Sequence, residues 1–282
     1  MSSHKEPNSV GIIGAQGQFG SWFSRLFAAR GQTVVAVDVG SQVSVKQLVE
    51  RVDAIVLAVP LGVTEVVLSQ LIPLMRRGQL LVELTSVKTP FEPLITALPC
   101  EVLSLHPMFS PSLPSLRGQS CIDCSANQGG ALANYFRSLL EEEGLSFVSM
   151  TPDEHDRTMA IVQGLTHFQA IVAGHCMVEA GFDPTQSLAV ASPIYRMRLA
   201  MVGRILAQNA RLYAEIQIFN PYVRDVLTAL EKSSQVFSQA IAERDVERFV
   251  AEFERARSGL KGFEQVAIEE SNRVIQALAS KE

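Results

Sequence analysis

Short apolar runs alternate with segments of helical periodicity through the first 150 residues, and this alternation is what most restricts the fold of the chain. The apolar runs predict strands at Ser9–Gly14, Thr33–Asp38, Asp53–Val59, Leu80–Leu84, Glu101–Leu105, Cys121–Asp123 and Ser146–Met150. The periodic segments between them predict helices at Gln18–Arg30, Val43–Arg51 and Val63–Met75. Continuous apolar strands joined by helical crossovers indicate a mostly parallel, Rossmann-type α/β sheet that is covered on both faces.

The character of the sequence changes at Thr151. Thr151 is followed by Pro152 at the first helical position and by Glu154 at the third, which is a capping box and a firm helix start. Helical periodicity then continues almost to Glu282. We therefore expect two domains, an α/β domain over residues 1–150 and an all-helical domain over residues 151–282. The chain length of 282 residues fits that number.

Composition excludes several classes of protein. The formal net charge of −5 gives no broad basic surface for nucleic acid. The first eight residues are polar and lack the apolar core of a secretory signal. Four cysteines in so long a chain do not form a disulfide framework, which favours a reducing, cytoplasmic location. The stretch 158–178 carries no Asp, Glu, Lys or Arg, but its Gln, Thr and His residues favour a helix buried in a domain or an oligomer over one in a membrane.

A glycine-rich turn follows the first predicted strand. The residues that would form its nucleotide-binding surface are Gly14, Gln16, Gly17, Gln18, Phe19 and Gly20. Glycines between a strand and a helix let the backbone approach a pyrophosphate at the helix N-terminus, although Ala15 departs from the usual G-x-G-x-x-G spacing. Asp38 ends the second strand, where an acid binds a ribose hydroxyl and disfavours a 2′-phosphate. The turn predicts NAD binding, and a tight turn without a ligand is the alternative.

Polar side chains follow two later strands. Ser86 and Lys88 come just after Leu80–Leu84, and His106 comes just after Glu101–Leu105. Ligands of open parallel sheets bind beyond the carboxyl ends of the strands. A histidine there is a candidate general base near neutral pH. A solvated loop is the alternative for each of the three residues.

The helical half contributes arginines in an otherwise apolar run. Arg196 and Arg204 lie about 80° apart around a helix and can face one cleft, whereas Arg198 faces away. Arginines in such a position favour the binding of carboxylate ligands. The alternative roles for them are an internal salt bridge or an oligomer contact. We predict no metal site, because His155 and His167 point in different directions on one helix and the two cysteines of Cys121–Cys124 face opposite sides of a strand.

Together these motifs resemble the prephenate dehydrogenase family of tyrosine biosynthesis. The segments that carry the resemblance are the early glycine turn, Leu84–Lys88, Leu105–Phe109, Glu154–Asp156, His167–Phe168 and Ser192–Arg204. They are most similar to the dehydrogenase half of bifunctional chorismate mutase–prephenate dehydrogenases. The resemblance implies an NAD-dependent oxidative decarboxylation of prephenate to 4-hydroxyphenylpyruvate, and a helical domain that forms a homodimer.

The resemblance also implies a role for each site residue. His106 would accept the proton of the 4-hydroxyl group, and Ser86 would orient His106. Arg204 would bind the ring carboxylate, with His167 and Arg196 holding the substrate and Lys88 lining the cleft.

Departures from the family pattern at Ala15, Ser110, Ser112 and Thr166 leave the substrate open. The same reaction on 4-amino-4-deoxyprephenate, in antibiotic biosynthesis, is an alternative. A protein that senses NAD without turnover is a less favoured one, because a sensor needs neither a base nor a carboxylate clamp.

Overall fold

The computed structural model describes residues 6–125 and 128–279 and divides the chain into two compact units. The first unit takes the chain up to Ala160 and also Ala214–Pro221. The second unit takes Ile161–Tyr213 and the chain from Tyr222 onward. Within the described residues, no helix combines the length and the apolar character needed to cross a membrane.

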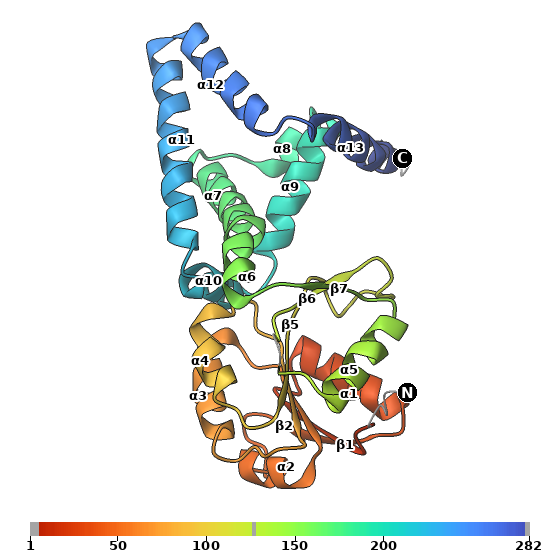
Figure 1. Cartoon of the computed structure of the whole chain (residues 1–282). Coiled ribbons are helices and arrows are strands. Elements are labelled where there is room, and N and C mark those ends of the chain that lie inside the picture. The colour runs from red at the N-terminus through yellow and green to blue at the C-terminus, as the bar shows by residue number, and fades with distance from the viewer. Residues whose placement is uncertain (1–5, 126–127, 280–282) are drawn as a thin grey trace. The chain divides into compact units, whose positions relative to one another are not determined.

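A sheet of seven strands forms the centre of the first unit (Figure 1). The strands are β1 (Ser9–Ile13), β2 (Thr33–Val37), β3 (Ala54–Leu57), β4 (Leu80–Glu83), β5 (Glu101–Pro107), β6 (Ser120–Asp123) and β7 (Ser146–Ser149). Their order is β2-β1-β3-β4-β5-β6-β7, and every neighbouring pair is parallel except β5 with β6. The strand order changes direction at β1, which places the glycine turn and the ends of β3 to β5 at the edge where ligands of such sheets bind.

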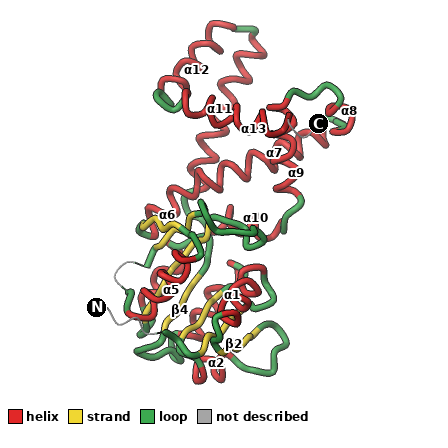
Figure 2. Tube along the Cα trace, turned by 90° about the vertical axis from the view of Figure 1, so that its right-hand side faces the viewer, coloured by secondary structure: helices red, strands yellow, loops and turns green. Residues whose placement is uncertain are grey.

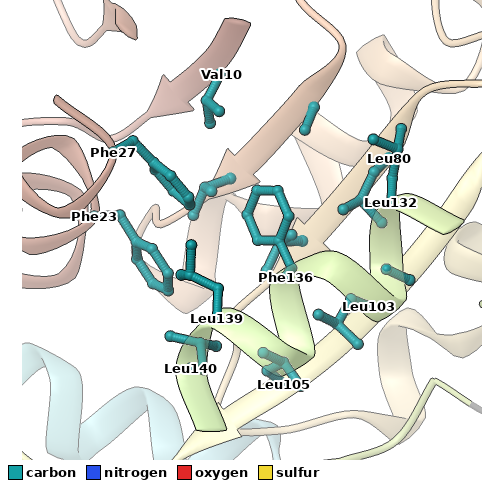
Figure 3. Packing of buried hydrophobic residues seen from close by; sticks show 14 of the residues in the cluster. Val10, Phe23, Phe27, Leu80, Leu103, Leu105, Leu132, Phe136, Leu139 and Leu140 are labelled. Carbon is teal, nitrogen blue, oxygen red and sulfur yellow. The ribbon is translucent and has the colours of Figure 1, made fainter. Parts of the chain in front are cut away.

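Helices cover both faces of this sheet. One face packs against α1 (Gln18–Ala29) and α5 (Ala131–Glu142), where Phe23, Phe27 and Phe136 meet alternate residues of the central strands (Figure 3). The opposite face packs against α2 (Val45–Arg51), α3 (Leu61–Leu71) and the short helices η1 (Thr89–Phe91) and α4 (Glu92–Thr96). Because strand side chains alternate between faces, the apolar runs fill both cores.

The second unit consists of helices, as Figure 2 shows. Helix α6 (Pro152–Met159) still belongs to the first unit, and the π-helix η2 (Ala160–Leu165) follows it at the boundary. The remaining helices are α7 (Thr166–Glu179), α8 (Pro184–Leu188), α9 (Pro193–Leu206), α10 (Ala210–Phe219), α11 (Val223–Glu243), α12 (Val246–Gly259) and α13 (Glu264–Ala279). Helix α7 packs against α9, and Gly174 makes this possible because a β-carbon there would lie 2.6 Å from Leu206 Cδ1.

The fold class expected from the sequence is confirmed: a mostly parallel sheet with helices precedes an all-helical region. The predicted capping box at Thr151 is present, with Thr151 Oγ1 accepting from the Glu154 amide. Two local features were not expected. A π-helix interrupts the uncharged stretch 158–178, and residues 214–221 return to the first unit although both flanking segments belong to the second.

Much of the uncharged stretch is exposed in the single chain, although Met159 and Ala160 at its start are buried. Ile161, Val162, Val172 and Val178 are between 45% and 74% exposed, and Gly174 is the buried residue of α7. The apolar character of these helices is therefore not explained by packing inside one described chain.

Candidate active site

The glycine turn has the close packing that a dinucleotide-binding turn requires. Gly14 has φ of +86°, a conformation that favours glycine, and a β-carbon there would collide with the carbonyl oxygen of Ala58. A β-carbon at Gly20 would collide with the carbonyl oxygen of Gly14. The turn and the start of α1 can only come this close without side chains at both positions, which is the reason for glycine in a phosphate-binding turn.

The start of α1 is open to an anion. Gly17 is the N-cap and supplies no side-chain acceptor to the first-turn amides, and Gln16, Gly17 and Gln18 are exposed. Asp38 lies beside the turn, since its Oδ2 accepts a 2.8 Å hydrogen bond from the Gln16 amide. Each carboxylate oxygen can accept a further hydrogen bond, so Asp38 retains capacity for a ribose hydroxyl. The residues present therefore fit a dinucleotide, with its pyrophosphate at the helix N-terminus.

Phe19 links the glycine turn to the segment that follows β5. Its ring packs edge to face against Phe109, with ring centroids 5.7 Å apart, and Trp22 contacts the same ring. Phe109 lies three residues after His106. The aromatic contact therefore fixes the nucleotide-binding turn relative to the end of β5, which carries the candidate base.

A buried ion pair lies under the ends of β4 and β5. Lys88 is 1% exposed, and its Nζ donates to both carboxylate oxygens of Glu83 at 2.9 and 3.0 Å and to the carbonyl of Leu105 at 2.8 Å. Glu83 also accepts from the hydroxyls of Ser104 and Thr85. All three donors of the Lys88 ammonium group are thus used inside the protein. We therefore correct the expectation that Lys88 lines the substrate cleft, because here it holds the backbone beside His106.

His106 ends a chain of three buried side chains. Its Nδ1 lies 2.8 Å from Nε2 of His155, and Nδ1 of His155 lies 2.7 Å from Oδ1 of Asp156. His155 and Asp156 are fully buried, and His106 is 3% exposed. Ser86, expected to orient His106, is half-buried in the turn after β4, and the contact at Nδ1 comes from His155 instead.

The electrostatic surroundings keep His106 neutral. Burial, followed by the proximity of His155 and of the Lys88 ammonium group, holds the pKa of His106 well below its ordinary value. Burial on its own would raise the pKa of Asp156. Hydrogen bonds from His155 and from the amides of Thr89 and Lys88 outweigh this effect and lower that pKa. The site thus contains a neutral imidazole, suited to accept a proton, and an ionised carboxylate at the far end of the chain.

Sequence reasoning missed the partners of His106. His155 was considered only as a metal ligand and as part of a family resemblance, and Glu83 was counted only as a strand residue. The capping box at Thr151 was the available signal, because it fixes the start of α6 and so places both His155 and Asp156 in the first two turns of that helix.

The second unit brings together other residues of the predicted substrate site. The His167 ring packs edge to face against Tyr213, with centroids 4.6 Å apart. Burial raises the pKa of Tyr213, and Arg204 nearby lowers it in part. Burial lowers the pKa of His167. Arg196 and Arg204 both lie on α9 and are exposed, so the sequence argument that they sit in an apolar environment does not hold for the single chain.

Within the described residues, no cluster of His, Cys, Asp or Glu side chains could hold a metal ion. Cys121 packs in the core beneath α5, whereas Cys124 packs in a separate cluster with Ile122 and Met159. The two cysteines are free thiols on different sides of the sheet, as the strand pattern predicted.

Two family models match the chain. Residues 26–149 match the nucleotide-binding domain of prephenate dehydrogenase, and residues 151–255 match its dimerization domain. The junction between them falls at the capping box of α6.

Three curated proteins are similar over most of the chain. A probable arogenate/prephenate dehydrogenase of Methanocaldococcus jannaschii is 33% identical over 86% of this chain and 58% of its own length. The T-protein of Enterobacter agglomerans is 35% identical over 89% of this chain and 67% of its own length. A 4-amino-4-deoxyprephenate dehydrogenase of Streptomyces pristinaespiralis is 28% identical over 88% of this chain and 90% of its own length. The chain thus spans about six tenths of the first relative and two thirds of the second.

A solved structure shares the fold. The prephenate dehydrogenase of A. aeolicus, crystallised with hydroxyphenyl propionate and NAD+, superposes with a TM-score of 0.70 at 17% sequence identity, over 91% of this chain and 98% of that one. The two matched domains and the T-protein relative, together with the nucleotide-binding turn and the buried histidine at the strand ends, establish that this chain belongs to the prephenate dehydrogenase family.

Proposed function

We propose that this chain catalyses the NAD-dependent oxidative decarboxylation of prephenate to 4-hydroxyphenylpyruvate, with release of CO2 and NADH. The observation that carries the proposal is the neutral, buried His106 at the end of β5, in the same unit as the glycine turn and Asp38. A non-catalytic nucleotide sensor has no use for such a base. Bound NAD would supply the hydride acceptor.

The chemistry assigned to the chain's own residues is limited. His106 takes the proton of the substrate 4-hydroxyl group, and the electron pair left on oxygen forms the carbonyl as C4 gives up hydride. Loss of the ring carboxylate as CO2 then restores an aromatic ring, with the 4-oxygen regaining a proton as the product phenol. Aromatisation supplies the driving force, so the protein mainly orients the ring and accepts one proton.

Two carboxylates of prephenate need cationic or hydrogen-bonding partners. We assign the ring carboxylate to Arg204, with Arg196 and His167 as further substrate contacts and Ser86 beside the hydroxyl group. Arg204 and His167 both lie next to Tyr213 within the second unit, which supports grouping them. The guanidinium of Arg204 can hold a carboxylate through two hydrogen bonds.

Asp38 favours NAD over NADP, because its carboxylate would repel a 2′-phosphate. Steady-state kinetics with each cofactor test this proposal. NAD should be used far better, and Asp38→Ala should reduce the preference. Equal use of NADP by the unmodified protein would contradict the placement of Asp38 on the ribose.

A second compound, 4-amino-4-deoxyprephenate, is also a candidate substrate. The Streptomyces pristinaespiralis relative is named for 4-amino-4-deoxyprephenate. The departures from the family pattern at Ser110, Ser112 and Thr166, on which the resemblance left the substrate open, are a second reason to test this compound. The Methanocaldococcus jannaschii relative adds arogenate as a compound to test. The decisive experiment follows NADH absorbance with NAD and each of the three compounds. Turnover of one compound identifies the substrate, and no turnover with any of them, despite NAD binding, would favour the sensor.

We also propose that the chain is a homodimer formed through its helical unit. The match to a dimerization domain and the exposed apolar residues of α7 and α9, such as Val178 and Ile194, support this. Multi-angle light scattering at micromolar concentration should give twice the chain mass of 30.8 kDa. A monomer at that concentration would contradict the proposal.

A further inference from the structure

We propose that His155 and Asp156 are positioning residues that hold His106 in the tautomer with a proton on Nδ1, so that Nε2 is the nitrogen that accepts the substrate proton. The inference rests on the proposed function for its catalytic consequence. Its structural part, the tautomer of His106, stands without any substrate. Neither residue needs to touch substrate or cofactor, since both act through the His106 ring.

The proton assignment begins at Asp156. Its carboxylate accepts hydrogen bonds from the amides of Lys88 at 2.9 Å and Thr89 at 2.8 Å, in addition to the contact with His155. A carboxylate that receives several donors is stabilised as the ionised, acceptor-only form. The atom that faces it, Nδ1 of His155, must therefore be the donor.

The rest of the assignment follows from the chemistry of imidazole. A neutral ring has one donor nitrogen and one acceptor nitrogen. With its proton on Nδ1, His155 presents the lone pair of Nε2 to His106, so Nδ1 of His106 carries the proton shared across the 2.8 Å contact. The lone pair of His106 is then on Nε2. The opposite assignment would need a second proton on His155, because Nδ1 of that ring already donates to Asp156.

The charged and titratable groups described around His106 are consistent with this proton assignment. Lys88 and Glu83 face it from the β4 side as a mutually neutralising pair. Cys121 and Asp123 lie on β6, and Arg137 Nη1 holds Asp123 at 2.6 Å. From α6 come His155 and Asp156, and the carboxylate of Asp156 is connected to the His106 ring through hydrogen bonds by way of His155. When His106 gains a proton at Nε2, the new positive charge is delocalised toward Asp156 through His155.

The position of α6 makes the chain of contacts rigid. The Thr151 capping box fixes the first turn, and Asn220 Nδ2 donates to the Asp156 carbonyl oxygen at 2.8 Å. The Asp156 carboxylate in turn holds the backbone at Lys88 and Thr89, two and three residues after Ser86. One carboxylate thus orients both the base and the turn that carries the second predicted catalytic residue.

The first experiment is spectroscopic and requires no substrate. The full-length protein, with and without NAD, is labelled with 15N at its five histidines, and long-range 1H–15N spectra assign each ring tautomer. His106→Asn and His155→Gln identify the two resonance sets. The expected result is a protonated Nδ1 and an unprotonated Nε2 on His106 at pH 7.5. An unprotonated Nδ1 on His106 would overturn the proposal.

The second experiment compares two replacements of one residue. His155→Gln offers Oε1 as an acceptor and can keep the His106 tautomer, whereas His155→Leu removes the acceptor. The base contributes a factor of about 10²–10⁴ to kcat, and we expect His155→Leu to lose most of that factor. The kcat of His155→Gln should be at least about 10-fold higher than that of His155→Leu. KM and NAD affinity should change little. The matched control is His175→Gln, an exposed histidine on α7 whose replacement should leave the kinetics unchanged.

The pH profile separates positioning from a purely structural role. Asp156→Asn removes the negative charge that stabilises protonated His106, so the acidic limb of the kcat/KM profile should move to lower pH as the plateau falls. If Asp156 had a purely structural role, Asp156→Asn would lower the melting temperature and the amount of active enzyme. The pH midpoint of the acidic limb would then stay unchanged. Lowered activity with an unmoved limb, or equal activity of His155→Gln and His155→Leu, would overturn the proposal. If the unmodified protein oxidises none of the three candidate substrates, the proposed function fails, while the spectroscopic result still decides the tautomer.

Discussion

The two units of the molecule differ in how their polar groups are satisfied. In the first unit, Glu83, Lys88, His155 and Asp156 are all buried, and each has hydrogen-bond partners within the chain. In the second unit, α9 presents exposed arginines beside exposed apolar side chains. The buried charges of the first unit are therefore already paired and held in place without a ligand or a second chain. The second unit leaves apolar and cationic side chains of α9 exposed in the single chain, which is the basis of the proposed dimer and substrate contacts.

From this difference we expect substitutions in the first unit to affect proton transfer or stability, and substitutions at the exposed arginines of the second unit to affect substrate binding. A change in the buried network of the first unit alters proton transfer or stability, because its charges cannot be compensated by water. If the exposed arginines of the second unit bind substrate as proposed, a change there should leave the fold intact and weaken substrate binding. The predictions below test this division, from the largest expected effect to the smallest.

The largest effect is expected at His106. His106→Asn keeps the approximate size of the side chain but removes the base, so turnover should fall by about 10²–10⁴-fold. NAD affinity, measured by fluorescence titration, should barely change because the glycine turn is untouched. Near-normal turnover on prephenate, arogenate and the amino analogue would remove His106 from the mechanism.

The buried ion pair should dominate stability. Lys88→Met leaves the Glu83 carboxylate buried without its cation, which should cost about 3–5 kcal/mol of unfolding free energy in urea denaturation. The matched control is the double variant Glu83→Gln with Lys88→Met, which removes both charges and should recover part of that loss. A Lys88→Met protein as stable as the original, with only a raised KM, would restore Lys88 to the substrate cleft.

A smaller effect, on substrate binding and not on turnover, is expected at Arg204. Arg204→Gln removes the bidentate partner of a carboxylate and should weaken substrate binding by about 1.5–3 kcal/mol, or about 10- to 150-fold in KM. The control is Arg198→Gln, on the other side of the same helix, which should leave KM unchanged. The proposed role would be excluded if the two variants had the same KM, or if Arg204→Gln melted at a markedly lower temperature.

The smallest effect concerns acid stability. The folded-state pKa of His106 is lowered by burial, so the unfolded chain binds a proton at this residue before the folded chain does. Its contribution to stability is complete above its ordinary pKa of 6.5 and is lost as the pH falls below that value toward the lowered one. Unfolding free energies measured from pH 8 to 5 should decline with a slope of up to about 1.4 kcal/mol per pH unit from this residue. His106→Asn should show a shallower decline, and parallel curves would contradict the neutral state of the buried ring.

The sequence predicted most of the first unit. Local patterns suffice for β1 to β4, because a run such as Leu80–Val82, apolar on both faces, is typical of a strand in a covered parallel sheet. The sequence also predicted the glycine turn, and in the structure Gly14 and Gly20 occupy positions where a β-carbon would collide with the backbone. Asp38 was expected beside this turn, and in the structure its carboxylate accepts a hydrogen bond from the Gln16 amide.

The sequence was less informative where a role depends on a partner far along the chain. Lys88 was assigned to a substrate cleft from its place after a strand, but its ammonium group is directed inward by Glu83 and by the Leu105 carbonyl. Arg196 and Arg204 of α9 were expected to face one cleft because their neighbours are apolar, and the single chain leaves both exposed. In both cases a local pattern cannot tell which side of an element is covered.

The sequence by itself determined the α/β and helical halves, the capping box that starts α6, the nucleotide-binding turn and His106 as the candidate base. These features depend on local spacing, which is read directly from neighbouring residues. The tertiary structure alone decided that His155, 49 positions away, lies against His106, and that Asp156 holds both His155 and the turn after β4. Such contacts arise when separate strands and helices pack around one core. The properties that matter for catalysis, burial, tautomer and charge, are set by that packing and not by sequence spacing.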